Sequence, residues 1–138
     1  MERLTRQRKI ILEELNKLKT HPTASDLYIL VRKRIPNISL GTVYRNLDIL
    51  SKEGKISKIT CDSYSRFDGD LKRHEHFICK KCQKVFDYGK SIRIKFDKDL
   101  FEKETGFKVL NYKIDICGLC KNCRSKKWKK YAQDAANQ

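Results

Sequence analysis

Residues 66–82 read RFDGDLKRHEHFICKKC, and this stretch carries two kinds of metal ligand. Cys79 and Cys82 form a C-x-x-C pair, whose tight turn lets both sulfurs face one Zn²⁺. His74 and His76 are two residues apart, and on an extended strand such residues share a face, so both imidazoles can reach one ion. Thiolates suit zinc, whereas imidazole with carboxylate suits Fe²⁺ or Mn²⁺. The stretch therefore predicts two neighbouring metal sites, one structural and one able to respond.

The composition limits the class of protein. The chain has 138 residues, 39% of them hydrophobic and 36% charged, which is enough for one domain or two small ones and too apolar for a disordered chain. The net charge of +15 favours a polyanionic partner such as nucleic acid, although a lysine-rich soluble surface gives the same charge. No apolar run reaches the length of a membrane span and no signal peptide is recognisable, so we expect a cytoplasmic protein whose cysteines are ligands or redox thiols rather than disulfides.

The first half of the chain predicts three short helices and a hairpin. Apolar residues recur at helical spacing, Thr23 and Ser39 are good N-caps, and Gly54 fits the position after a helix end. Two short runs on either side of a turn at residues 61–64 alternate like strands. The expected helices cover about 5–19, 23–34 and 39–53, and the expected strands cover 55–60 and 65–68.

This order of elements describes a winged helix-turn-helix, with the third helix as the recognition helix and the hairpin as the wing. The outward face of that helix would present four side chains to DNA, where they can stack, contact phosphate or bind a base edge. A helical bundle with a solvated polar face fits the same pattern. The four residues are Thr42, Tyr44, Arg45 and Asn46.

The second half predicts a small α+β unit. A strand is expected over 84–88, a helix over 92–105 closed by Gly106, and a strand over 107–116 in which polar residues, Asp115 among them, alternate with apolar ones. The basic tail, 124–138, is read as a helix or a frayed end. A unit this small needs zinc and pairing with a second copy to complete its core. We place the domain boundary after Gly69, giving domains of 1–69 and 70–138.

A second thiolate pair near residue 120 would complete a four-thiolate zinc site with Cys79 and Cys82. Spacing alone leaves two choices for that pair, because Cys117 with Cys120 and Cys120 with Cys123 both read C-x-x-C. A thioredoxin-like redox site is disfavoured, since it predicts one pair at a helix start rather than two pairs after strands.

The chain has only three histidines, and two of them are in the opening stretch. If His21 joins His74 and His76, one ion bridges the two halves of the chain and its occupancy controls their relative orientation. No Gly-rich phosphate loop, G-x-S-x-G or H-E-x-x-H motif is present, so the sequence predicts no enzyme. The candidate oxygen ligands are Asp68, Asp70, Glu75 and Asp87.

Several stretches together resemble the ferric uptake regulator (Fur) superfamily of bacterial metal-dependent repressors. The resemblance implies an α+β protein with an N-terminal winged helix and a C-terminal dimerisation domain. It also implies a homodimer that binds A/T-rich palindromic operators in double-stranded DNA when metallated, and it puts the second zinc pair at Cys120 and Cys123. The matching stretches are HPTASDLY (21–28), PNISLGTVYRNL (36–47), RFD (66–68), HEHFICKKC (74–82) and GFKV (106–109).

The resemblance is greatest to the peroxide-sensing PerR branch, whose regulatory ion has three histidine and two aspartate ligands. Iron-sensing members usually carry Glu at the two carboxylate positions, whereas both are Asp here. With iron bound, the resemblance implies that peroxide oxidises His21 or His74, which opens the dimer and releases DNA. By position the five ligands, which hold Fe²⁺ or Mn²⁺, fall on His21, Asp68, His74, His76 and Asp87.

One departure from the family concerns the N-terminus. We expect the usual extra helix to be missing here, because residues 5–8 already match the start of the next helix, so DNA contacts would rest on the third helix and on Arg6, Arg8 or Lys9. Two alternatives stay open. One is a sensor of iron or another metal without peroxide chemistry, and the other is a zinc-stabilised module that binds nucleic acid without regard to sequence. Apart from peroxide, no small-molecule substrate is expected. We expect no membrane as a partner either.

Overall fold

The computed structural model describes residues 3–62, 64–72, 74–87 and 94–124, which fall into two compact units, residues 1–73 and 74–138. Residues 125–138 of the predicted tail (124–138) lie outside the described residues, as do residues 88–93, where one expected strand ends and one expected helix begins. Each unit is described separately below.

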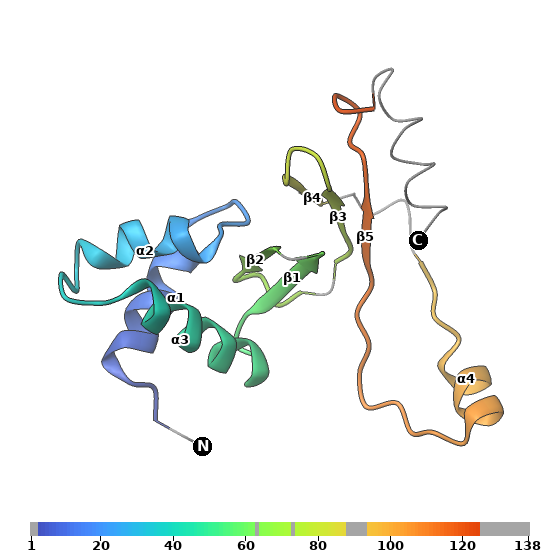
Figure 1. Cartoon of the computed structure of the whole chain (residues 1–138). Helices are drawn as coiled ribbons and strands as arrows, with labels where there is room; N and C mark the ends of the chain where they lie inside the picture. The colour runs from blue at the N-terminus through green and yellow to red at the C-terminus, as the bar shows by residue number, and fades with distance from the viewer. Residues whose placement is uncertain (1–2, 63, 73, 88–93, 125–138) are drawn as a thin grey trace. The chain divides into compact units, whose positions relative to one another are not determined.

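The first unit contains three helices followed by a two-stranded antiparallel hairpin (Figure 1). The hairpin pairs Ser57 with Asp68 at one end and Cys61 with Tyr64 at the other, with Asp62 at a positive φ of 54° in the turn. This order confirms the winged helix-turn-helix expected from the sequence. The elements are α1 (Arg6–Lys17), α2 (Ala24–Arg32), α3 (Leu40–Lys52), β1 (Ser57–Cys61) and β2 (Tyr64–Asp68).

Local capping sets where these helices begin. The hydroxyls of Thr5, Thr23 and Ser39 each accept a hydrogen bond from the backbone N–H three residues later, at 3.1–3.2 Å. Such a bond satisfies one of the donors that a helix start leaves without an intrahelical partner. Helix α1 ends two residues earlier than expected, because Leu18 already has an extended backbone.

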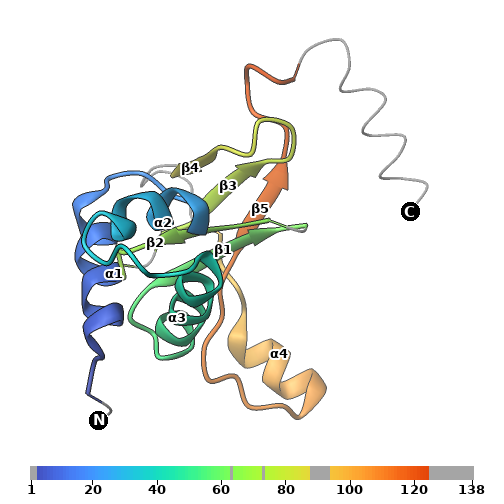
Figure 2. The same cartoon turned by 60° about the vertical axis from the view of Figure 1, so that its left-hand side comes forward.

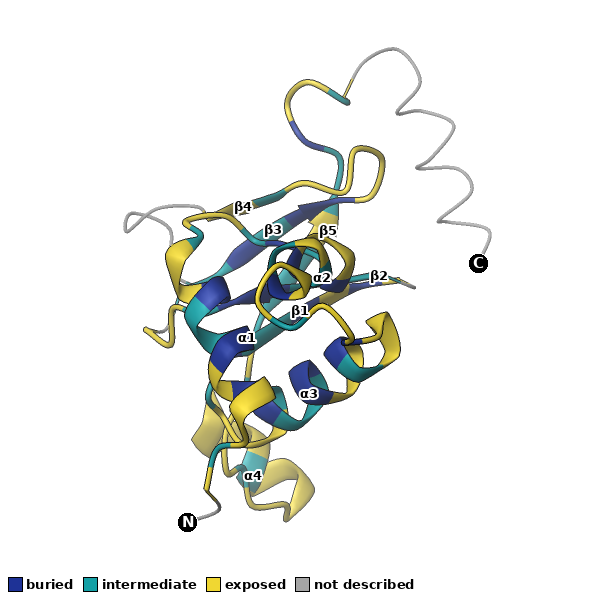
Figure 3. Cartoon of the chain, turned by 90° about the vertical axis from the view of Figure 1, so that its left-hand side faces the viewer, coloured by how far each residue is buried: buried dark blue, intermediate teal, exposed yellow. Residues whose placement is uncertain are grey.

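The core of the first unit lies between its three helices and β2. Its most buried side chains are 0–1% exposed, and each stabilises the fold by about 1.5–3 kcal/mol through its burial. In Figure 3 buried stretches recur along α1 and α3, whereas α4 of the second unit has no buried residue. The central side chains of this core are Ile11, Leu15, Leu27, Val31, Val43, Leu47, Leu50 and Phe67.

The second unit is built on a three-stranded sheet in the order β4-β3-β5, whose strands lie side by side in Figure 2. Strand β4 runs antiparallel to β3, and β5 runs parallel to it. The elements are β3 (His76–Cys79), β4 (Val85–Asp87), α4 (Lys98–Thr105) and β5 (Asp115–Gly118).

The helix and the strand predicted for the second unit over 92–105 and 107–116 extend beyond the observed elements. The helix predicted from residue 92 begins at Lys98, after the N-cap Asp97, and it ends as predicted at Gly106, which has a positive φ of 74°. The strand predicted over 107–116 is wrong for residues 107–114, which form no ladder with described residues of this chain. Their alternation instead leaves apolar side chains in solvent, with Phe107 67% and Leu110 89% exposed.

Candidate functional site

The four-thiolate group forms where two parallel strands end. Strands β3 and β5 run in the same direction, so the turns that follow them emerge at the same end of the sheet. Cys79 is the last residue of β3 and Cys82 lies in the turn that follows, while the turn after β5 carries Cys120 and Cys123. The backbone N–H of Lys80 donates to the carbonyl of Gly118 at 2.8 Å and holds the two turns together.

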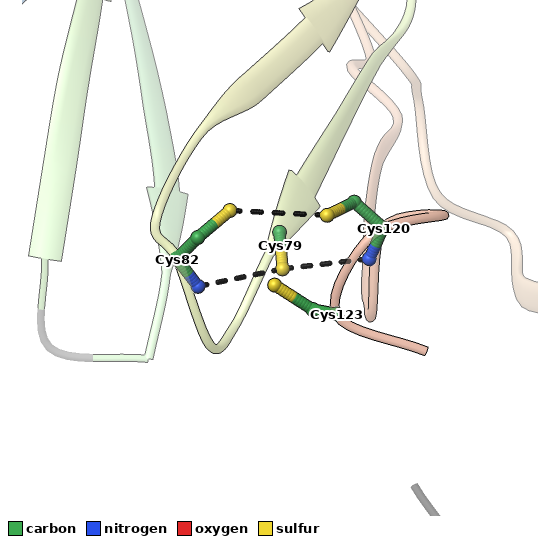
Figure 4. A group of neighbouring side chains, drawn as sticks. All are labelled: Cys79, Cys82, Cys120 and Cys123. Carbon is green, nitrogen blue, oxygen red and sulfur yellow. Dashed lines mark hydrogen bonds between the residues drawn. The ribbon is translucent and has the colours of Figure 1, made fainter. Parts of the chain in front are cut away.

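The spacing of the four sulfurs fits a tetrahedral zinc ion. All four Sγ atoms lie within 4.8 Å of one another, and those of Cys82 and Cys120 are 3.9 Å apart (Figure 4). Zn–S bonds of about 2.3 Å in a tetrahedron place the sulfurs about 3.8 Å apart. The second pair in this group is Cys120 with Cys123, whereas Cys117 lies within strand β5.

The electrostatics of the thiols are those of a cation site. Burial opposes ionisation of Cys79, but backbone N–H groups of Cys120, Cys82 and Lys81 outweigh it and lower the pKa of Cys79 to about 6. A hydrogen bond with Cys120, together with burial and the other sulfurs, raises the pKa of Cys123 to about 12. Four adjacent sulfurs therefore resist carrying four negative charges until a cation offsets the repulsion.

A nitrogen and oxygen set lies at the other end of β3 in the second unit. His76 and Asp87 are directly paired across β3 and β4, and His76 Nε2 is 3.4 Å from Asp87 Oδ1. His74 Nε2 lies 3.5 Å from the same oxygen, and the two imidazole rings are 4.4 Å apart between centroids. Two imidazole nitrogens and one carboxylate thus converge, as expected for residues that share one face of a strand.

The first unit contributes a histidine–aspartate pair of its own. His21 Nε2 lies 3.2 Å from Asp68 Oδ2, and both side chains are 11% exposed. Two hydrogen bonds next to this pair connect the link between α1 and α2 to β2. Arg66 Nη1 donates to the His21 carbonyl at 2.8 Å, and the Phe67 N–H donates to the Pro22 carbonyl at 2.9 Å.

Asp115 is a site residue that the sequence analysis missed. It was read as one of the polar residues alternating along a strand, but it pairs with His76 in the parallel ladder, and its Oδ1 lies 3.4 Å from His76 Nδ1. Burial opposes ionisation of Asp115, but the adjacent His76 imidazole and Lys113 ammonium outweigh it and lower its pKa. One signal could have found it: the parallel pairing of two strands that each lead to a thiolate pair puts His76 beside Asp115.

Five of the expected DNA-contact residues are accessible on the first unit. On α3, Tyr44 is 46% exposed, Arg45 is exposed, and Thr42 is half-buried with its hydroxyl 2.8 Å from that of Ser39. Arg6 and Lys9, near the start of α1, are exposed. These side chains can reach a partner without changes in the core.

The other two expected DNA-contact residues, Arg8 and Asn46, are buried at 9% and 8% exposure. The guanidinium of Arg8 lies 3.5 Å from Glu53 and also donates to the Thr5 hydroxyl. Asn46 is held by α1 and by its own helix. Both side chains are thus engaged within the first unit, and we leave them out of the DNA-binding face.

None of the described helices has the length and apolar composition required to cross a membrane. The family model described as "Ferric uptake regulator family" matches residues 2–117. Among characterised proteins, the peroxide-responsive repressor PerR of Staphylococcus aureus is 37% identical over 125 residues, which cover 90% of this chain and 84% of that protein.

Solved structures are similar over nearly the same range. The ferric uptake regulator of Helicobacter pylori, described as having three functional metal-binding sites, is 26% identical with a TM-score of 0.68 over 91% of this chain and 84% of that one. The peroxide stress regulator of Campylobacter jejuni is 29% identical with a TM-score of 0.59 over 86% of this chain and 87% of that one. The fold described above is therefore shared with both over most of its length.

Proposed function

Because the chain belongs to the ferric uptake regulator family, we propose that it is a peroxide-responsive, metal-dependent repressor that binds operator DNA as a homodimer in the cytoplasm. Proteins of this family are transcriptional regulators rather than enzymes. The observation that carries the proposal is the separation of the metal ligands into a thiolate group at one end of β3 and a histidine–aspartate set at the other.

The thiolate group is proposed as a structural zinc site. The second unit has a small sheet and a helix without buried residues, so its own core provides little stability. Zinc binding adds free energy of folding in such units, because the ligands are assembled only in the folded state. The ligands are Cys79, Cys82, Cys120 and Cys123.

The histidine–aspartate residues are proposed as one regulatory site for Fe²⁺ or Mn²⁺, with His21 and Asp68 from the first unit and His74, His76 and Asp87 from the second. The chain itself supports this joining. Asp68 and His74 are six residues apart, and six residues of extended chain span at most about 20 Å. Imidazole and carboxylate ligands also suit these ions better than they suit a structural zinc.

Metal occupancy would act by fixing the orientation of the two units. An ion shared between them favours one orientation by its extra binding energy in that state, and DNA binding by a dimer depends on that orientation. A bound iron ion supplies reactivity toward peroxide. His21 and His74 are the side chains expected to be oxidised, and loss of either imidazole as a ligand weakens the site.

The DNA-binding face is proposed to consist of Thr42, Tyr44 and Arg45 on α3 together with Arg6 on α1. Tyr44 offers its ring to thymine methyl groups, and Arg45 reaches phosphate or guanine. The net charge of +15 strengthens the attraction to DNA at low salt. A palindromic operator is expected because a two-fold dimer reads two equal half-sites, and the resemblance to the family implies that it is A/T-rich.

The experiment that tests this function starts from zinc-loaded protein without other metals. An operator is selected from random DNA duplexes with the Mn²⁺-loaded protein, and its affinity is then measured with and without Mn²⁺. We expect binding to need Mn²⁺ and to be lost in His21→Ala, while Asp99→Ala, which removes an exposed carboxylate in α4, behaves like the parent. Binding that ignores both metal and DNA sequence would support the zinc-stabilised nucleic-acid module instead.

Peroxide separates the two sensing alternatives. It is expected to release the Fe²⁺-loaded protein from its operator and to leave the Mn²⁺-loaded protein bound. Mass spectrometry should then find one added oxygen on a peptide containing His21 or His74. Equal resistance of the two forms would indicate a sensor of metal availability without peroxide chemistry.

A further inference from the structure

The two ring nitrogens of His76 face two different carboxylates. Nε2 lies 3.4 Å from Asp87 Oδ1, and Nδ1 lies 3.4 Å from Asp115 Oδ1. The two nitrogens point away from each other across the ring, so a cation bound at Nε2 has Asp87 on its side and Asp115 behind the imidazole. Asp115 therefore acts on such a cation through His76 and does not coordinate it.

Asp115 is well placed to hold the imidazole. It is paired with His76 in the ladder between β3 and β5, so the backbones of two strands fix the separation of the two side chains. The His76 side chain is 2% exposed and that of Asp115 is 16% exposed, which limits competition from water. The second oxygen of Asp115 lies 3.1 Å from Lys113 Nζ, and this contact orients the carboxylate toward the ring.

We propose that Asp115 is a positioning residue that accepts the Nδ1–H of His76, so that Nε2 carries no proton and can bind the regulatory ion. The identity of the ion in this inference rests on the proposed function, whereas the tautomer of the His76 ring does not. A histidine that binds a metal generally donates its other ring N–H to a carboxylate or carbonyl, and loss of that partner weakens metal binding about 10–100-fold. The hydrogen bond at one nitrogen also decides which nitrogen carries the proton.

The first arm of the test needs no regulatory metal. Zinc-loaded protein carrying Asp87→Ala, which removes the competing acceptor near Nε2, is labelled with ¹⁵N-histidine and the His76 tautomer is read by NMR. We expect the Nδ1–H tautomer when Asp115 is present and the Nε2–H tautomer after a further Asp115→Ala. Asp115→Asn keeps an acceptor oxygen and should retain most of the Nδ1–H form. An unchanged tautomer in Asp115→Ala would overturn the inference.

The second arm measures Mn²⁺ affinity in the otherwise native chain. Asp115→Ala should bind Mn²⁺ about 10–100-fold more weakly, keep its zinc, and regain parental operator affinity when Mn²⁺ is saturating. His76→Ala, which removes a ligand, should not regain it, and Asp99→Ala serves as the control. Mn²⁺ affinity within about two-fold of the parent would count against a positioning role.

The two arms distinguish a failure of the proposed function from a failure of the positioning role of Asp115. If the parent binds no Mn²⁺, the proposed function fails, while the tautomer measurement still decides the inference. If Asp115→Ala loses zinc as well as Mn²⁺, the residue serves the fold of the second unit in general and the positioning role is refuted.

Discussion

Asn46 in α3 donates one side-chain hydrogen bond to Gln7 in α1 at 3.3 Å and another to the Thr42 carbonyl at 3.0 Å. This residue therefore ties the first helix to the third. We predict that Asn46→Ala lowers the free energy of unfolding by about 1–2 kcal/mol, because both hydrogen bonds are lost at a buried position. Urea unfolding followed by circular dichroism measures this, with the exposed Asn37→Ala as the control. Unchanged stability with a loss of DNA binding would instead make Asn46 a direct DNA contact.

Tyr44, two residues earlier on α3, should behave in the opposite way. Its side chain is 46% exposed, so Tyr44→Ala is expected to leave the unfolding midpoint nearly unchanged. The operator affinity should fall by about 1–3 kcal/mol, the usual worth of a good contact to a base. Fluorescence anisotropy with the selected operator measures the loss. A similar loss on duplexes of unrelated sequence would show that Tyr44 contacts the backbone rather than the bases.

Arg6 and Arg8 offer a matched pair two residues apart on α1. Arg6 is exposed, whereas Arg8 is buried beside Glu53. We predict that Arg6→Ala reduces the slope of log K against log salt by about 1, as for the loss of one phosphate contact. Arg8→Ala should leave that slope unchanged and lower the unfolding midpoint, because Glu53 loses its buried partner. A reduced slope in Arg8→Ala alone would reverse the assignment.

Local signals predicted the elements that position the site. N-cap residues such as Thr23 and Ser39 satisfy helix starts within four residues of chain, so helix positions in the first unit could be read from the sequence. The thiolate pairs were also readable, because a C-x-x-C turn is a local geometry. Asp87 was assigned to the site through the resemblance, and the ladder between β3 and β4 places it directly opposite His76.

What could not be predicted depends on tertiary packing. The rotation of α3 decides that Tyr44 faces solvent and Asn46 faces α1, and a polar residue gives no sign of its direction on a helix with polar residues on two sides. Asp115 is indistinguishable from its outward-facing neighbours until the parallel register with His76 is known. The strand expected over 107–116 followed from alternation alone, which reports a half-apolar face but not a pairing partner, and only its last two residues lie in β5.

Zinc retention should depend on Cys123 and not on Cys117. We predict that Cys123→Ser loses the zinc and the cooperative unfolding of the second unit, while Cys117→Ser keeps about one zinc per chain. Zinc should also be released as the pH falls. Thiolates are the ligands, and the pKa of Cys79 is lowered to about 6, so protons compete with zinc progressively as the pH falls toward and below that value. Zinc content after dialysis at each pH measures both effects, and retention by Cys123→Ser would reject this ligand set.

The exposed apolar residues of the second unit provide the test of the homodimer. Leu110 is 89% exposed and Phe107 67% exposed, in a segment whose alternation has no pairing partner among the described residues. Burying such side chains against a second copy is worth about 25 cal/mol per Å², and a carboxylate there would have to be desolvated. Leu110→Asp is therefore expected to shift the protein from dimer to monomer in analytical ultracentrifugation and to weaken operator binding by at least about ten-fold, since a monomer holds one half-site. Ile29→Asp is the matched control, because Ile29 in α2 of the first unit is 62% exposed and its substitution should leave the dimer intact. A Leu110→Asp protein that stays dimeric, or an Ile29→Asp protein that dissociates, would place the interface elsewhere on the chain.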